Sequence, residues 1–170
     1  MTSRIILTVL GSDRPGLTQA IATAVTGADG NWLESRLGRL GGQYVGSVLV
    51  ELPAENVARL ENAVRAIDAE GLHVSLIPAG ADPGRGTELA FELVGQDRPG
   101  IVREVTAVLA GLGVNIEDLD TGIENGAWSG ERLFRAKARV TLPGDIGADA
   151  VRDALETISG EVMVDFTFAA

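Results

Sequence analysis

Cysteine is absent from this chain of 170 residues, and histidine occurs once, as His73. The absence of cysteine excludes disulfides, thiol nucleophiles, iron–sulfur clusters and cysteine-ligated zinc. Aromatic residues make up only 4% of the sequence, so a core must be built from Val, Leu, Ile and Ala. Wholly apolar runs reach four residues at most, far short of the roughly 20 needed to span a bilayer. The first residues lead into a strand-like segment rather than a signal peptide, so a soluble, cytoplasmic protein is expected.

Positive charge is also scarce. Lys and Arg number 14 against 24 Asp and Glu, which gives a net charge of −10. The basic residues are scattered singly among more numerous acids, whereas binding to a phosphate backbone takes clustered Lys and Arg. Direct contact with nucleic acid is therefore not expected. The 45% of hydrophobic residues, set against 22% charged, indicate a packed globular core rather than disorder.

Glycine, by contrast, is abundant, with 22 residues, and several of them belong to an internal repeat. The sequence Gly-Ser-Asp-Arg-Pro-Gly at residues 11–16 recurs as Gly-Gln-Asp-Arg-Pro-Gly at residues 95–100, at an offset of 97 − 13 = 84. At the same offset Asn31 matches Asn115. Each loop follows an apolar, strand-like run and precedes a helix-like pattern. The chain therefore contains two copies of one unit.

Apolar spacing predicts the same order of elements in both copies: strand, helix, two strands joined by a hairpin, helix and strand. This is the ferredoxin-like βαββαβ unit, an α+β fold in which one sheet carries two helices on a single face. The predicted domains are residues 1–78 and 88–170, joined by a linker at 79–87 that contains proline and glycine. Glycines end the first helix of each copy and are predicted as its C-terminal caps: Gly27 and Gly30, and Gly111 and Gly113.

The repeated loop has the chemistry of an anion site. Proline fixes the backbone, glycine removes bulk, and the first amides of the following helix point outward, where the helix dipole also favours a carboxylate. The alternative is a simple helix start that is capped by the aspartate. Asn31 and Asn115 each follow the loop glycine by 15 residues (31 − 16 and 115 − 100). Each could equally be a helix-ending residue in the left-handed conformation.

Together the loop and the asparagine match the needs of a free α-amino acid. Backbone amides suit its carboxylate, aspartate oxygens suit its ammonium group, and an asparagine amide can donate to or accept from either. These residues resemble the ACT domain, a ligand-sensing module of amino-acid metabolism. The resemblance rests on Asp-Arg-Pro-Gly after the first strand, on Gly-Val-Asn-Ile at residues 113–116 and on the βαββαβ order, and it covers nearly the whole chain twice.

A tandem of this length without an attached enzyme looks most like the glycine cleavage system transcriptional repressor group. The resemblance implies that the two domains pair side by side into an eight-stranded antiparallel sheet with helices on one face. It also implies amino acids bound between the loop of one domain and the asparagine of the other. One implied site is Gly11, Ser12, Asp13, Arg14, Pro15 and Gly16 with Asn115, and the other is Gly95, Gln96, Asp97, Arg98, Pro99 and Gly100 with Asn31.

The loops depart from the family in one respect. Several amino-acid-binding members carry Asn or His at positions occupied here by Asp13 and Asp97, or by Gly11 and Gly95. An ionised aspartate can hold an ammonium group but repels a carboxylate at close range. The lack of large loop side chains favours a small ligand such as glycine or serine.

The expected function is that of a non-catalytic sensor acting on transcription or metabolism through a protein partner such as a transcription factor, because the negative charge disfavours direct DNA contact. Neither a cofactor nor a metal is expected, and exposed sheet edges are compatible with a homodimer. The second hypothesis is a small acylphosphatase-like hydrolase, in which Arg14 or Arg98 holds phosphate and an asparagine places water.

Three other features are considered as possible functional residues. His73 lies in an apparent strand and is interpreted as a structural or surface residue. Trp128, in a glycine-rich hairpin, either anchors a partner protein or folds over its own sheet. The acidic residues of the second copy are interpreted as a solvated edge rather than a metal site: Glu117, Asp118, Asp120 and Glu124.

Overall fold

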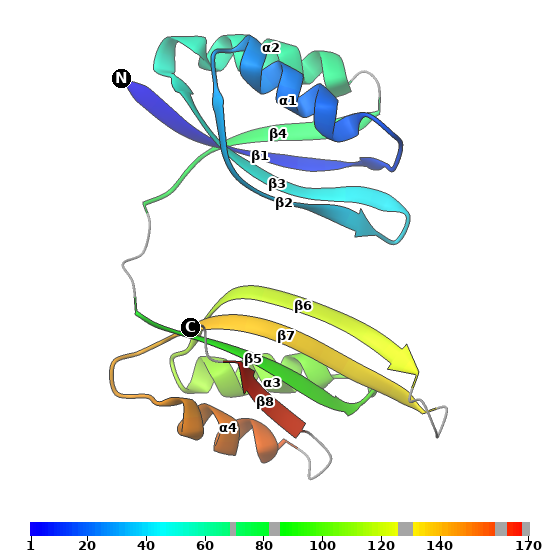
Figure 1. Cartoon of the computed structure of the whole chain (residues 1–170), viewed down its shortest axis with the longest axis vertical. Coiled ribbons are helices and arrows are strands. Elements are labelled where there is room, and N and C mark those ends of the chain that lie inside the picture. Colours follow the sequence, from blue (N-terminus) through cyan, green and yellow to red (C-terminus); the bar gives the residue numbers. More distant parts are fainter. Residues whose placement is uncertain (69–70, 82–85, 126–130, 159–162, 168–170) are drawn as a thin grey trace. The chain divides into compact units, whose positions relative to one another are not determined.

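The computed structural model describes residues 1–68, 71–81, 86–125, 131–158 and 163–167, and it divides into two compact units, Met1–Asp82 and Pro83–Ala170 (Figure 1). Trp128 lies outside the described residues. Both units have the predicted βαββαβ order, so the α+β fold class is confirmed. None of the helices in the described residues is long and apolar enough to cross a membrane.

The first unit is a four-stranded antiparallel sheet in the order β2-β3-β1-β4. Helices α1 and α2 cover one face of this sheet (Figure 1). Its elements are β1 (Thr2–Ser12), α1 (Leu17–Gly27), β2 (Asn31–Leu40), β3 (Gln43–Pro53), the 3-10 turn η1 (Ala54–Asn56), α2 (Val57–Asp68) and β4 (Leu72–Pro78).

The second unit repeats this topology, with the strand order β6-β7-β5-β8. Its elements are β5 (Thr87–Gln96), α3 (Ile101–Gly111), β6 (Asn115–Asn125), β7 (Arg132–Leu142), α4 (Ala148–Glu156) and β8 (Met163–Thr167). The strands therefore form two sheets of four. Their union into one sheet of eight stays a prediction.

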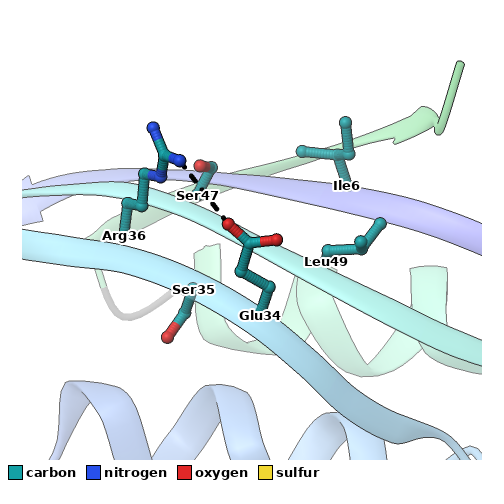
Figure 2. Close-up of a pocket in the computed structure, with 6 residues that line it drawn as sticks. All are labelled: Ile6, Glu34, Ser35, Arg36, Ser47 and Leu49. Carbon is teal, nitrogen blue, oxygen red and sulfur yellow. Dashed lines mark ion pairs between the residues drawn. The ribbon is translucent and has the colours of Figure 1, made fainter. Parts of the chain in front are cut away.

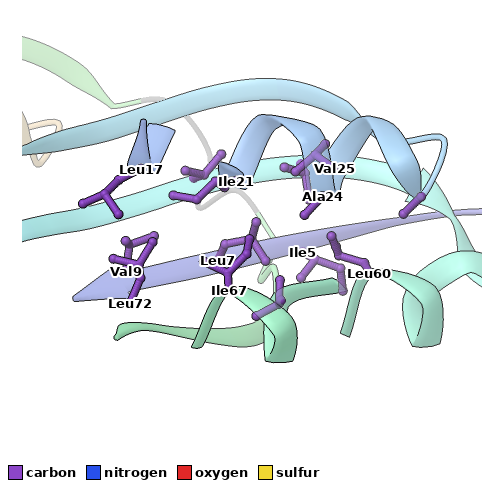
Figure 3. Packing of buried hydrophobic residues seen from close by; sticks show 14 of the residues in the cluster. Ile5, Leu7, Val9, Leu17, Ile21, Ala24, Val25, Leu60, Ile67 and Leu72 are labelled. Atoms are coloured by element: carbon purple, nitrogen blue, oxygen red, sulfur yellow. The ribbon is translucent and has the colours of Figure 1, made fainter. Parts of the chain in front are cut away.

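Each unit has its own hydrophobic core between sheet and helices. Side chains alternate along a strand, so every second residue of β1 faces the helices. Ile5, Leu7 and Val9 are buried there, and Ile21 and Val25 of α1 pack onto them (Figure 3). The corresponding core of the second unit is built on Leu89, Phe91, Leu93, Val105, Leu109 and Leu155. These cores hold β1 and β5 against the helices that follow them, which positions the connecting loops.

The first helix of each unit ends differently from its counterpart. In the second unit Gly113 has a φ of +70°, as the predicted left-handed cap requires. In the first unit the left-handed residue is Asp29, with a φ of +56°, so the prediction of Gly27 or Gly30 is wrong. Asp29 accepts hydrogen bonds at Oδ2 from Asn56 Nδ2 (3.1 Å) and Arg59 Nη1 (3.2 Å). Aspartate visits this conformation more readily than most residues, and these contacts hold it there.

Candidate functional site

The loops after β1 and β5 make the same turn into their helices. Gly16 has φ +94° and ψ −5°, and Gly100 has φ +92° and ψ −6°, a conformation that side chains with a Cβ rarely adopt. The first backbone bonds of the two helices are Ala20 N to Gly16 O (2.9 Å) and Glu104 N to Gly100 O (3.0 Å). At neither Gly16 nor Gly100 does a side chain cap the helix, and in the second unit the Ile101 amide bonds to the Arg98 carbonyl of the loop (3.4 Å).

The loop aspartates do not cap these helices but pair with arginines from the hairpin of their own unit. Asp13 Oδ2 lies 3.5 Å from Arg39 Nε, near the end of β2. Asp97 Oδ2 lies 3.3 Å from Arg132 Nη2, at the start of β7, and the Asp97 amide also donates to the Arg132 carbonyl (2.9 Å). Sequence reasoning missed both arginines, because each lies far from its partner along the chain. Each aspartate thus ties its loop to the neighbouring hairpin, and its charge is partly balanced.

The loop arginine of the second unit pairs with a glutamate of the helix that follows it. Arg98 Nη1 donates to Glu104 Oε1 (2.9 Å) and Arg98 Nη2 donates to Glu104 Oε2 (2.5 Å), a two-pronged ion pair. The two side chains are 37% and 34% exposed. Hydrogen bonding from Arg98 holds the pKa of the Glu104 carboxyl below its ordinary value, and the same bonds raise the pKa of Arg98. At the offset of 84 the residue in the place of Glu104 is Ala20 (104 − 84), so α1 carries no carboxylate at this position.

Asn31 lies at the far end of its unit from the loop. It pairs with Glu51 of β3, which pairs with Arg4 near the start of β1, whereas the loop follows Ser12 at the other end. The separation along β1 is 12 − 4 = 8 residues, or roughly 26 Å at about 3.3 Å per residue. One unit therefore does not bring its loop and its asparagine together.

Asn115 has the same position in the second unit. It pairs with Thr141 of β7, which pairs with Glu88, again 96 − 88 = 8 residues from the end of β5 at Gln96. Its side-chain Nδ2 donates to Glu117 Oε1 (2.5 Å), which also accepts from Thr141 Oγ1 (3.0 Å). The amide of Asn115 is therefore oriented by an acid that sequence reasoning had assigned only to a solvated edge.

The family of the chain follows from the match to its first unit. The ACT-domain family model matches residues 3–75, most of Met1–Asp82. The second unit repeats the strand order and the loop conformation of the first. The first unit is an ACT domain and the second repeats its fold, which makes the chain a tandem of ACT-like units.

Two solved structures share the fold of this tandem ACT protein over almost its whole length. The crystal structure of an unknown protein from Galdieria sulphuraria is 31% identical, with a TM-score of 0.79 and 98% of each chain covered. The crystal structure of a proposed glycine cleavage system transcriptional repressor is 18% identical, with a TM-score of 0.74 and 98% of each chain covered. At 18% identity the second likeness concerns the fold alone. No curated protein matches the sequence.

The first unit of the tandem ACT protein carries a hollow between α1 and α2 that sequence reasoning missed. Its volume is about 550 Å³, and it begins at the loop glycine Gly16 and the neighbouring Ala20. Small residues on both helices, such as Ala24 and Ala63, leave the space open, and Arg59 lies on its wall. The sequence signal for this hollow is the small residues that α1 and α2 carry where they line it: Ala20, Ala24, Gly27, Ala63 and Ala66.

A smaller hollow of about 190 Å³ lies on the face of the same sheet that carries no helix (Figure 2). Ile6 and Leu49 form its apolar side, and Ser47 lies beside them. An ion pair between Glu34 and Arg36, with 3.6 Å between Oε1 and Nη2, borders it. This hollow contains none of the predicted ligand-binding residues.

Two of the acidic residues of β6 pair with arginines of β7. Asp118 Oδ2 lies 3.7 Å from Arg139 Nη2, and Glu124 Oε1 lies 3.0 Å from Arg135 Nε. Arg135 also bonds Glu92 of β5, and these carboxylates raise its pKa. Among the described residues of the tandem ACT protein, no group of three His, Asp or Glu side chains is placed to hold a metal ion. Asp118 and Glu124 thus act as ion-pair partners across the sheet.

Proposed function

We propose that this protein is a non-catalytic sensor of a small α-amino acid, with glycine or serine as the first candidates. The observation that carries the proposal is the pair of loops with the same left-handed glycine and the same uncapped helix start. A helix start of this kind presents backbone donors and the positive end of the helix dipole to a carboxylate. Two copies with the same geometry favour ligand binding over a mere helix start.

The loop aspartates supply the second half of the recognition. An ionised carboxylate has about four acceptor positions, so Asp13 and Asp97 can each keep a hairpin arginine and still accept from a ligand ammonium group. In each loop the arginine lies beside one carboxylate oxygen, Oδ2, at 3.5 Å in the first unit and 3.3 Å in the second. The ligand would then be held at both its charged ends.

Each proposed site takes its asparagine from a second domain, because the loop and the asparagine of one unit lie roughly 26 Å apart (8 residues at about 3.3 Å each). Residues 11–16 would combine with Asn115, and residues 95–100 with Asn31. The edge strands β2, β4, β6 and β8 offer backbone groups for pairing the two sheets, or for pairing two copies of the chain. Ligand binding would then favour one arrangement of the domains over another.

The sensor is proposed to act in the cytoplasm through a protein partner such as a transcription factor. The net charge of −10 disfavours direct binding to nucleic acid. The acylphosphatase-like alternative would need an arginine and an asparagine side by side. Within each unit they lie at opposite ends of the sheet, and Arg98 is held by Glu104. The structure gives that alternative no supporting contact within a unit.

Isothermal titration of the full chain with each of the twenty amino acids tests the proposal. Glycine or serine is expected to give measurable heat and to raise the melting temperature, since a ligand that binds only the folded state stabilises it. The double variant Asp13→Asn, Asp97→Asn should lose this heat. Asp153→Asn, the same change on the exposed side of α4, should retain it.

The absence of heat and of a melting shift with all twenty amino acids would remove the sensor proposal. Equal loss of binding in the Asp153→Asn control would show that net charge, rather than the loop aspartates, governs recognition.

A further inference from the structure

The face of the first sheet that carries no helix is aliphatic at its centre. Because Ile5, Leu7 and Val9 face the helices, the residues between them along β1 face the other way, together with their register partners on β3 and β4. Two rows across these strands are aliphatic: Leu49, Ile6 and Ile77, and then Val45 and Leu10. Leu10 and Ile77 are 52% and 49% exposed. Contiguous apolar patches on a protein surface commonly mark interaction sites.

The second unit provides an internal comparison, because the same face of its sheet is charged. Arg139 has the place in the pairing of β5 with β7 that Leu49 has in the pairing of β1 with β3, and Lys137 has the place of Ser47. An antiparallel sheet with one face in water normally carries polar side chains on that face, as the second unit does. The fold therefore does not require the aliphatic face of the first unit.

The charged side chains of this face lie at its rim. Arg4 Nε lies 3.1 Å from Glu51 Oε1, in the row before Ile6, and Arg36 Nη2 lies 3.6 Å from Glu34 Oε1 on the edge strand β2. The row between the two aliphatic rows is uncharged and carries hydroxyl groups: Ser47, Thr8 and Ser75. An uncharged centre inside a polar rim is the usual arrangement of a protein–protein interface.

We propose that this face packs against the same face of a second copy of the chain, as a two-fold dimer of first units. The covering surface must be uncharged at its centre, because burying a charge against aliphatic side chains is costly. The same face of a second copy meets this requirement. Its two cations and two anions also cancel, so two chains of net charge −10 can approach here with little repulsion. The inference does not depend on ligand binding.

The small hollow on this face favours one arrangement of the two copies. A two-fold axis parallel to the strands reverses the order β2-β3-β1-β4, so β4 of one copy lies over β2 of the other. Ile77 of one copy then faces the hollow of about 190 Å³ that Ile6 and Leu49 border in the other, within the same row (Figure 2). A cavity of roughly 150 Å³ holds a benzene ring, so the hollow has room for this side chain.

The size of the face sets the expected strength of the dimer. Four strands about 4.8 Å apart, each about nine residues long at about 3.3 Å per residue, cover about 550 Å². A pair of such faces buries about 1,100 Å², at the low end of specific interfaces. We therefore expect a reversible dimer with a Kd on the order of 10 micromolar rather than a permanent one.

Sedimentation velocity of the full chain, from about 1 to about 300 micromolar, tests the proposal. The wild type is expected to pass from monomer to dimer over this range. Ile77→Glu and Leu10→Glu should each raise the Kd by about thirtyfold or more, because each buries a charge in the dimer. Ile123→Glu is the matched control, since Ile123 is 46% exposed on β6 of the other unit, and it should dimerise as the wild type does.

A mixture of two variants tests the arrangement itself. Leu49→Lys alone should also lose the dimer, but mixed with Ile77→Glu it should form a heterodimer, because the new lysine and glutamate then face each other across the interface. Circular dichroism establishes that each variant is folded. A wild type that stays monomeric, or a dimer that survives in the folded Ile77→Glu and Leu10→Glu variants, would overturn the proposal. Loss of the dimer in Ile123→Glu would place the contact on the second unit and would overturn it as well.

Discussion

The left-handed glycines of the two loops allow a quantitative prediction of the stability that is lost when each is replaced by alanine. Gly16 and Gly100 have φ of +94° and +92°. A Cβ at Gly16 would meet no atom within 4 Å, and a Cβ at Gly100 would meet only Glu104 Oε1 at 3.9 Å, an ordinary contact. Replacement by alanine therefore creates no clash, and its cost is that of the backbone conformation alone. For a residue with a Cβ this cost is about 1–2 kcal/mol.

The control is the same substitution at the other end of each helix. Gly27 and Gly111 are the last residues of α1 and α3, and a Cβ at either would meet nothing within 4 Å. Neither has a positive φ. Alanine there reduces the freedom of the unfolded chain without strain and should stabilise the protein by about 0.5–1 kcal/mol. The same glycine-to-alanine substitution is thus expected to lower the stability at the start of a helix and to raise it at the end of the same helix.

Urea unfolding followed by circular dichroism measures both effects. With a slope of about 1 kcal/mol per molar urea for a small unit, Gly16→Ala and Gly100→Ala should lower their midpoints by about 1–2 M. Gly27→Ala and Gly111→Ala should raise theirs by about 0.5–1 M. Gly16→Asn should recover part of the loss, because asparagine visits the left-handed region more readily than alanine. A neutral or stabilising Gly16→Ala would refute the assignment of the loop conformation.

Two further predictions concern neighbouring contacts. Asp29→Ala should destabilise the first unit by about 1–2 kcal/mol. Asp29→Gly also loses the bonds to Asn56 and Arg59, but it should destabilise the unit by less because glycine accepts the φ of +56°. Equal losses of stability in urea unfolding would mean that the side-chain bonds, and not the backbone conformation, account for the effect. Carbon-13 NMR should find the Glu104 pKa below its ordinary value. The pKa of Glu104 is lower in the folded protein than in the unfolded chain. The stability difference between wild type and Glu104→Gln should therefore be present at pH values above the ordinary glutamate pKa, and it should vanish as the pH falls through the pKa of Glu104 in the folded protein. A difference that is independent of pH would contradict this.

The fold was predictable because its signals are local and occur twice. The strand alternation, the helical stripes and the turn at Gly41-Gly42 each depend on neighbouring residues, and the offset of 84 between the loops aligned the two copies. The cap at Asp29 was missed because its left-handed conformation is held by Asn56 and Arg59 of another element, 27 and 30 residues away. No local pattern reports such a contact.

The backbone conformation of the two loops could be predicted from the sequence, but the side chains that contact the loop residues could not. The loop glycines and the helix starts follow from residues 11–16 and 95–100, but the arginines that pair with the loop aspartates come from the hairpins. Glu104 was within reach of sequence reasoning, since a glutamate in the first turn of a helix lies on the side of the preceding loop. The comparison with Ala20 would have shown the difference between the two units.

The number of open loops sets the size of the response that a sensor of this design can give. A ligand shifts an equilibrium between two domain arrangements only by its difference in affinity for them. At about ten times its Kd, a ligand that binds one arrangement through one site contributes about 1.4 kcal/mol, or about tenfold. Two equal sites would contribute about 2.8 kcal/mol, or about a hundredfold. A chain in which one loop binds ligand is therefore expected to give a smaller, graded response, and a chain in which both loops bind ligand a steeper one.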